Sequence, residues 1–175
     1  FTCLRQTFRQ FTLDATLRLR GTASVIWDYR GVLGPNLPQS DATLHPLAKT
    51  RYQAVQLSPT GWQVIRVDEQ GRSTTLASGP ATNHPIWQLN LQRQRDGGVT
   101  LRSGGKELWT GAPDANIAKD DPGAIGLWVE PHTHLSVEKF KIDGKSLPAK
   151  LSYLGLEALL GAGENLVNWQ ERSGP

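Results

Sequence analysis

The chain has 175 residues, of which 38% are hydrophobic and 20% charged, and its net charge at pH 7 is +3. This length suits one domain with a full core and is too short for two ordinary domains. No apolar run approaches the roughly 20 residues that a membrane-spanning helix needs, so no membrane span is expected. Because the basic residues are scattered among acidic ones, we predict no nucleic-acid partner.

Ten runs of the sequence have the alternation or the β-branched and aromatic content of strands. Turn residues such as Pro59-Thr60-Gly61 and Asp143-Gly144 separate them. Antiparallel sheets with this many strands fold back on themselves. We therefore predict an all-β fold, a two-sheet antiparallel sandwich of the jelly-roll type. In chain order the runs are 11–20, 23–30, 51–58, 61–68, 72–77, 86–93, 98–103, 107–110, 124–130 and 135–142.

The first predicted strand, residues 11–20, alternates throughout. Its odd-numbered residues from Phe11 to Leu19 are apolar, while the even-numbered ones are Thr, Asp and Arg. One face of this strand therefore belongs to the core, with Leu17 in it. By the same argument, the apolar residues between positions 87 and 91, Trp87 and Leu91 included, are predicted to face the core.

The second predicted strand, residues 23–30, carries aromatic and ionisable residues in succession. Trp27 and Tyr29 share the phase of its apolar residues, which favours the core. The opposite phase holds a carboxylate and a guanidinium, and the next strand can place a tyrosine and an amide beside them. Such a set can bind a polyol. The predicted ligand-binding residues are Asp28, Arg30, Tyr52 and Gln56.

Catalytic and cofactor motifs that spacing can reveal are absent from the sequence, among them G-x-S-x-G, H-E-x-x-H and the phosphate-binding loop. Glu130, His132 and His134 stand at alternate positions, which would aim them the same way on an extended chain. Pro131 interrupts that run, however, and a fourth ligand is missing. We expect no catalytic residue, no metal and no cofactor.

The beginning of the chain bears on its processing. Cys3 is the single cysteine, so it cannot form an internal disulfide, and the fold must hold by packing. The sequence starts at Phe1 and contains no Met. We expect a processed product or a part of a longer one, from which any signal peptide has been removed.

Beyond Pro148 the character of the sequence changes. Residues 151–163 space their leucines as a short amphipathic helix would. We divide the chain into a sandwich, 1–148, and a C-terminal helix-like segment with a tail, 149–175. This second part is expected either to pack back on the sandwich or to bind a partner, so that a larger assembly would form through residues 151–175.

Three segments carry a resemblance to known proteins: LRQTFRQFTLDATLRLRGTASVIWDYRG, RYQAVQLSPTGWQVIRVDEQG and GAIGLWVEPHTHLSVEKFKIDG. Over residues 4–143 the chain resembles concanavalin A-like jelly-roll domains of the 3-keto-disaccharide hydrolase and laminin-G-like type. The resemblance implies a concave sheet that binds glycans, with Arg30 and Gln56 at polar positions of that sheet. It also implies an extracytoplasmic location, periplasmic or secreted.

The sequence departs from the hydrolase-like members at three positions. Ala54 stands where they tend to carry Glu, and Trp128 and Val129 replace Gln and His. Without an obvious general acid or base, the sequence favours a non-catalytic binding or interaction module over an enzyme, with a glycan or a protein as its ligand. Two alternatives stay open: a glycoside-cleaving hydrolase of the same fold, and an accessory structural subunit of a larger, membrane-attached assembly.

The last residues look like the opening segment of the resembling domains. That segment has the form N-x-W-x-x-x-x-G and precedes the first long strand, whereas here Asn168, Trp169 and Gly174 stand at the C-terminus. An exposed Trp169 would be costly. We expect the tail to fold back and bury Trp169 against residues 11–20; otherwise the tail is a partner-binding arm or the start of a following copy.

Overall fold

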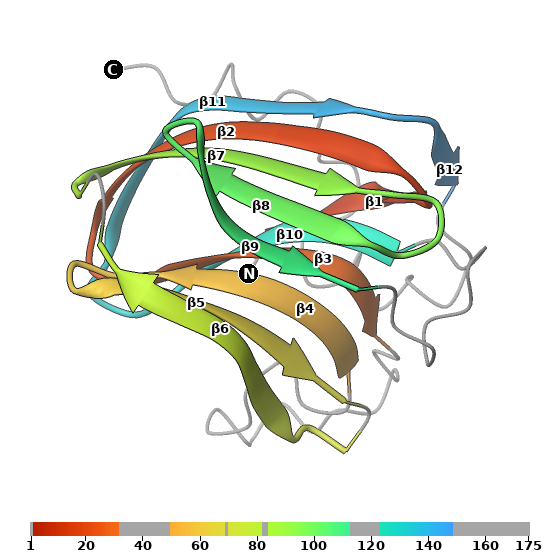
Figure 1. Cartoon of the computed structure of the whole chain (residues 1–175), viewed down its shortest axis with the longest axis horizontal. Helices are drawn as coiled ribbons and strands as arrows, with labels where there is room; N and C mark the ends of the chain where they lie inside the picture. The colour runs from red at the N-terminus through yellow and green to blue at the C-terminus, as the bar shows by residue number, and fades with distance from the viewer. Residues whose placement is uncertain (1, 32–49, 69, 82–83, 113–122, 149–175) are drawn as a thin grey trace.

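The computed structural model describes residues 2–31, 50–68, 70–81, 84–112 and 123–148. These ranges form strands that are arranged in two facing antiparallel sheets (Figure 1). The first six are β1 (Thr2–Phe8), β2 (Phe11–Arg20), β3 (Ala23–Gly31), β4 (Thr50–Leu57), β5 (Gly61–Val67) and β6 (Ser73–Pro80). The others are β7 (Ile86–Arg93), β8 (Val99–Ser103), β9 (Lys106–Gly111), β10 (Gly123–Val129), β11 (His134–Asp143) and β12 (Ser146–Pro148).

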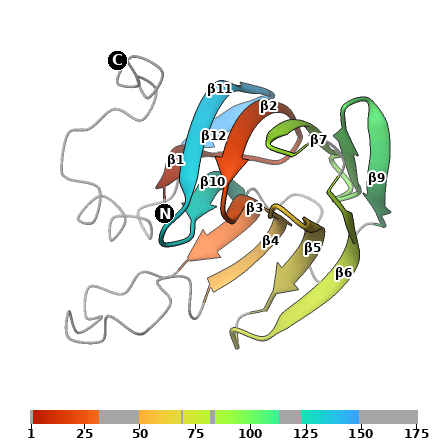
Figure 2. The same ribbon diagram turned by 90° about the vertical axis from the view of Figure 1, so that its left-hand side faces the viewer.

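The seven-stranded sheet has the order β12-β1-β10-β3-β4-β5-β6, and the five-stranded sheet has the order β11-β2-β7-β8-β9. In Figure 2 the edge strands β6 and β9 lie on one side of the sandwich, and β1 and β11 lie on the other. The predicted all-β sandwich is therefore confirmed. The ten predicted strands are all present, with ends that differ by up to a few residues.

The main core lies between the sheets and consists of the inward-facing residues of both. Leu13, Leu17 and Leu19 of β2 are fully buried there, together with Trp27 of β3 and Trp87 of β7. The alternation of residues 11–20 correctly predicted which side of β2 is inside. Non-polar side chains buried from two sheets at once are the main stabilising contribution in a sandwich of this kind.

A second apolar cluster lies on the outer face of the seven-stranded sheet, the face turned away from the five-stranded sheet. Its members come only from strands of that sheet, and they alternate with residues of the main core. They are nearly as buried as the main core, with exposed fractions of 7% or less. The cluster consists of Ile26, Tyr29, Tyr52, Ala54, Val67 and Ala124, with Ile65 and Trp128 packed against it.

The outer face of the five-stranded sheet is polar, and several of its charged groups pair with each other. Arg18 of β2 contacts Glu138 of β11 at 3.1 Å. Asp14 accepts a hydrogen bond from the Asn90 amide at 2.8 Å and has Lys139 at 3.8 Å. The polar side of residues 11–20 therefore faces outward, and Arg18 and Asp14 on it have partners on the neighbouring strands.

Two strands were not predicted, and both lie at one edge of the seven-stranded sheet. β12 has three residues, which is too short to show any periodicity. β1 pairs with β10 through a register shift between Cys3 and Thr7.

Several predictions concern residues outside the described ranges. These are the helix-like segment 151–163 and the tail with Trp169. The division at residue 148 likewise stays a prediction. Within the described ranges the structure contains no helix that is long and apolar enough to cross a membrane.

Candidate functional site

Asp28 breaks the alternation of β3. Its φ is 53°, in the left-handed region, and the pairing of β3 shifts register at this point with both β4 and β10. The backbone of β10 comes so close that a Cβ on Gly123 would lie 2.3 Å from the Cα of Asp28. This bulge turns Asp28 toward the same interior as Trp27 and sends Tyr29 to the outer face.

Inside the sandwich, Asp28 forms an ion pair with Arg93 from the end of β7. The Arg93 Nε lies 2.7 Å from the Asp28 Oδ1, and the two side chains are 0% and 3% exposed. Burial raises the pKa of the Asp28 carboxyl, while the positive charges of Arg93, Arg30 and Arg51 oppose this rise. The pair thus joins the two sheets by a charge contact that water does not reach.

The guanidinium of Arg93 also holds two segments of backbone at this end of the sandwich. Its Nη1 donates to the carbonyl of Arg9, in the link between β1 and β2, and to the carbonyl of Gln94 at 3.4 Å, just after β7. A third segment is held by close packing, because a Cβ on Gly144 would lie 2.5 Å from the carbonyl oxygen of Gln10. Three connections between strands therefore meet at one place.

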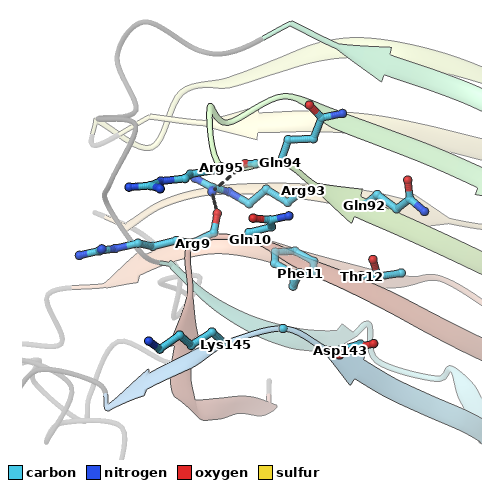
Figure 3. A pocket seen from close by; sticks show the side chains of 11 residues that line it. Arg9, Gln10, Phe11, Thr12, Gln92, Arg93, Gln94, Arg95, Asp143 and Lys145 are labelled. Atoms are coloured by element: carbon cyan, nitrogen blue, oxygen red, sulfur yellow. Dashed lines mark hydrogen bonds between the residues drawn. The ribbon is translucent and has the colours of Figure 1, made fainter.

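These three connections border an open hollow of about 710 Å³. It lies at the end of the sandwich where β11 meets β12, which is the end at the right of Figure 1. Figure 3 shows its side chains. The Arg9, Arg95 and Lys145 side chains extend toward the same side, while Gln92, Thr12 and Asp143 lie on the other. The lining consists of Arg9, Gln10, Phe11, Thr12, Gln92, Arg93, Gln94, Arg95, Asp143, Gly144 and Lys145.

The chemistry of this lining is polar and mixed. Three amides, a hydroxyl, a carboxylate and basic side chains provide both donors and acceptors. Phe11 is the aromatic residue of the lining, and it is buried in the core rather than presented as a flat stacking surface. The hollow is therefore suited to hydrogen-bonding a hydroxyl-rich or charged ligand.

The structure divides the four predicted ligand-binding residues between two faces. Asp28 is in the interior. Arg30 is on the same inner face, because it pairs in register with Arg51, and Arg51 points to the same side of β4 as Val55 of the main core. Tyr52 and Gln56 are on the outer face of the seven-stranded sheet. Strict alternation along β3 predicts that Asp28 and Trp27 face opposite sides of the sheet. The bulge places both on the same side, so this prediction was wrong.

The outer-face pair has partners within the sheet. Tyr52 is 7% exposed, and burial together with the negative charge of Glu130 raises its pKa. The Gln56 carbonyl oxygen accepts a hydrogen bond from the amide of Gln63 across the strand pair. Ligand binding by Tyr52 and Gln56 stays a prediction.

A turn lies at the centre of the run Glu130, His132 and His134, so these residues do not alternate along one extended strand. His132 has a φ of 61°, and Glu130 accepts a hydrogen bond from Trp128 Nε1 at 2.8 Å. Over the part of the chain that the structure describes, no group of three His, Cys, Asp or Glu residues is placed to hold a metal ion.

Sequence reasoning missed the lining of the hollow. Its polar residues lie in or beside turns, at Arg9-Gln10, Gln94-Arg95 and Asp143-Gly144-Lys145, where alternation carries no information. The density of Arg, Gln and Lys at these turns is a signal that could have been used. The basic residues scattered in sequence gather here in space, which the count of charges along the chain could not show.

No protein-family model matches the sequence, and no curated protein sequence matches it. Among solved structures, the chain is similar to carbohydrate binding module CBM66 from Bacillus subtilis, with a TM-score of 0.52 and 11% identity over 77% of this chain and 75% of that one. An alginate lyase from Pseudomonas aeruginosa has a TM-score of 0.43 and 15% identity, over 78% of this chain and 65% of that one.

A third similar structure is the kappa-carrageenase from Pseudoalteromonas carrageenovora. Its TM-score is 0.42 and its identity 11%, over 86% of this chain and 60% of that one. At such identities the likeness to the CBM66 module shows the fold alone. The chain is a jelly-roll β-sandwich of the kind that this carbohydrate binding module adopts.

Proposed function

We propose that this protein is a non-catalytic carbohydrate-binding module and that the hollow at the β11–β12 end is its ligand site. The observation that carries the proposal is the lining of that hollow, in which three connections and the strand ends beside them bring amide, hydroxyl, carboxylate and guanidinium groups to one place. Sugars present many hydroxyls that both donate and accept, and convergent groups of this kind select them.

The backbone around the hollow is held in place from the interior, which favours a role in ligand binding. Arg93 is anchored by Asp28 inside the sandwich and holds the carbonyls of Arg9 and Gln94 on either side of the hollow. Polar groups held in place before the ligand arrives lose less entropy on binding. The proposal agrees with an extracytoplasmic role, in which such a module meets glycans.

The absence of catalysis is part of the proposal. Glycoside cleavage commonly needs two carboxyl groups that face each other across the bond. Among the residues that line the hollow, Asp143 is the one carboxylate. The charged groups that act on the interior carboxylate Asp28 are the arginines 93, 30 and 51, which suits a structural ion pair.

A glycan array followed by calorimetric titration of the best ligand tests this function. We expect Gln92→Ala and Gln94→Ala each to weaken binding about fivefold to twentyfold, the effect of losing one hydrogen bond of about 1–1.8 kcal/mol. Gln88→Ala is the matched control, since Gln88 is an exposed residue of the same strand at the opposite end.

Two results would count against the proposal. A folded protein that binds no glycan would favour a protein ligand or a structural role in a larger assembly. Equal loss in Gln92→Ala and Gln88→Ala would show that the hollow is not the site. In that case the outer face of the seven-stranded sheet, with Tyr52 and Gln56, becomes the surface to examine.

A further inference from the structure

We infer that two copies of this chain associate through β6, an edge strand of the seven-stranded sheet, so that their sheets join across a twofold axis. In the described part of the chain β6 is the last strand of that sheet and pairs with β5 alone. An edge strand has N–H and C=O groups that point away from its neighbour and can pair with a further strand. The inference is independent of the proposed glycan site, because β6 contributes no residue to the lining of the hollow.

The outer side of β6 is accessible along its length. Figure 2 shows β6 at the margin of the sandwich that it shares with β9. Over the described residues, the backbone hydrogen bonds outside the strand ladders include none from β6. Three of its residues are half-buried, and the exposed ones are Ser73, Thr74, Thr75, Ser78 and Pro80. A partner strand therefore meets no obstacle on this side.

Compared with the other edges of the two sheets, β6 is both long and uncharged. It has eight residues, STTLASGP, without a charged side chain. The edge strands β9 and β11 contain lysine and glutamate residues, and β12 has three residues and ends at a proline. Charged side chains, prolines and short strands are what keeps sheet edges from pairing. Because like charges opposite each other destabilise a ladder, a strand that pairs with its own copy is best uncharged.

Half-buried apolar side chains beside this edge add a hydrophobic contribution. The pairing of Ala77 with Val64 and of Thr75 with Ile65 leaves Leu76 as the extra residue of a bulge. Leu76 and Ala77 pack against the main core and stay partly exposed. A strand added beside β6 would cover more of both side chains. The bulge also bends β6, which limits the length of the contact and predicts a weak dimer.

The side chains of β6 favour a second copy over an unrelated extended peptide. Recognition of a foreign strand takes its specificity from pockets that accept alternate side chains. The exposed side chains of β6 are those of serine, threonine and proline, which are too small to wall such pockets. Serine and threonine pairs across an antiparallel ladder do stabilise it. In a twofold arrangement each chain uses its β6 edge once, so association stops at two copies.

Sedimentation equilibrium over a range of protein concentrations tests the association. We expect a reversible dimer with a Kd of about 10–100 µM, since one pair of strands buries less surface than a standard interface. Hydrogen exchange at low and high concentration localises the contact. Amides of residues 73–80 should exchange more slowly in the dimer, and those of β9 should exchange at the same rate in both samples.

Variants at one threonine tie the dimer to β6. Full antiparallel overlap of two β6 strands places the twofold axis near Leu76, so Thr75→Lys brings two like charges together and should weaken the dimer about tenfold or more. The matched control is Thr110→Lys, because Thr110 is an exposed threonine on β9, an edge strand of the other sheet. Mixing Thr75→Lys with Thr75→Glu should restore the association, since opposite charges then meet.

Three results would overturn the inference. One is a protein that stays monomeric at about 0.5 mM, well above the expected Kd. Another is a dimer that Thr75→Lys weakens no more than Thr110→Lys does. The third is a mixture of Thr75→Lys and Thr75→Glu that associates no better than either variant alone. Each of these would leave the carbohydrate-binding proposal standing, because the hollow lies within one chain.

Discussion

Two Asp–Arg pairs in this protein have the same contact and opposite surroundings. In both, an arginine Nε lies 2.7 Å from a carboxylate oxygen: Arg93 with Asp28, and Arg72 with Asp68. The first pair is 0% and 3% exposed, and the second is 75% and 34% exposed. Burial raises the pKa of Asp28, whereas hydrogen bonds from the Arg72 and Gln70 backbone lower the pKa of Asp68.

The comparison shows that the surroundings of an ion pair, more than its length, decide what the pair does. Asp28 and Arg93 have no water to replace a lost partner, so each depends on the other. Asp68 orders the turn between β5 and β6 by accepting two backbone hydrogen bonds at 2.9 and 3.0 Å, and water can replace its charge contact. The interior pair therefore has the structural role, and the exposed pair shapes a turn.

The largest expected effect comes from removing the charge of the interior carboxylate. Asp28→Asn keeps a residue type that tolerates the left-handed backbone, yet it leaves Arg93 charged and buried without its counterion. We expect a loss of about 3–5 kcal/mol in the free energy of unfolding, measured with denaturant. The matching change Asp68→Asn should lower the free energy of unfolding by much less.

A double-mutant cycle sharpens this result. Arg93→Met combined with Asp28→Asn removes the charge of both partners, so we expect the double variant to lose less stability than the sum of the two single variants. If the two losses simply add, Asp28 and Arg93 do not depend on each other, and the contrast between the two pairs fails.

A purely apolar site provides the next comparison. Leu17 is fully buried between the sheets, and Leu17→Ala should lower the free energy of unfolding by about 2–5 kcal/mol through the cavity it leaves. Thermal or denaturant unfolding measures this loss, with Thr16→Ala on the outward side of β2 as the control. A loss no larger than that of the control would show that the inward face was wrongly assigned.

The bulge that turns Asp28 inward can be tested from its neighbour. In Gly123→Ala the added methyl group would meet the Asp28 backbone at 2.3 and 2.7 Å, so β10 must move and the ion pair with it. We expect a loss of about 1–3 kcal/mol. Gly98→Ala, where the nearest atom is an Asp96 side-chain oxygen at 3.2 Å, should cost clearly less; similar losses would mean that the close approach does not constrain β10.

The smallest effect belongs to the exposed pair. Because the pKa of Asp68 is lowered in the folded protein, its contribution is present above the unfolded-state pKa and is lost as pH falls through the folded-state value. Asp68→Asn should therefore reduce stability slightly at pH 7, and by progressively less as pH falls below the unfolded-state pKa. A difference between the two proteins that persists unchanged at pH 2 would contradict this assignment.

The fold could be predicted from the sequence because alternation reports which face of a strand is inside. Leu13, Leu17 and Trp87 followed it without exception. The site could not be predicted in the same way, since one bulge at Asp28 reverses the phase for the rest of β3. The lining of the hollow comes from turns that meet only after both sheets have formed, so no local pattern placed Arg9 beside Lys145.

The glutamine side chains provide the most direct measurement of where a glycan binds. In a nitrogen–proton NMR spectrum the amide groups of Gln10, Gln92 and Gln94 report on the hollow, and those of Gln56 and Gln63 report on the outer face of the seven-stranded sheet. On titration with the best oligosaccharide from the array, we expect the signals of the first group to move and those of the second to stay. Movement of Gln56 and Gln63 alone would contradict the hollow as the site.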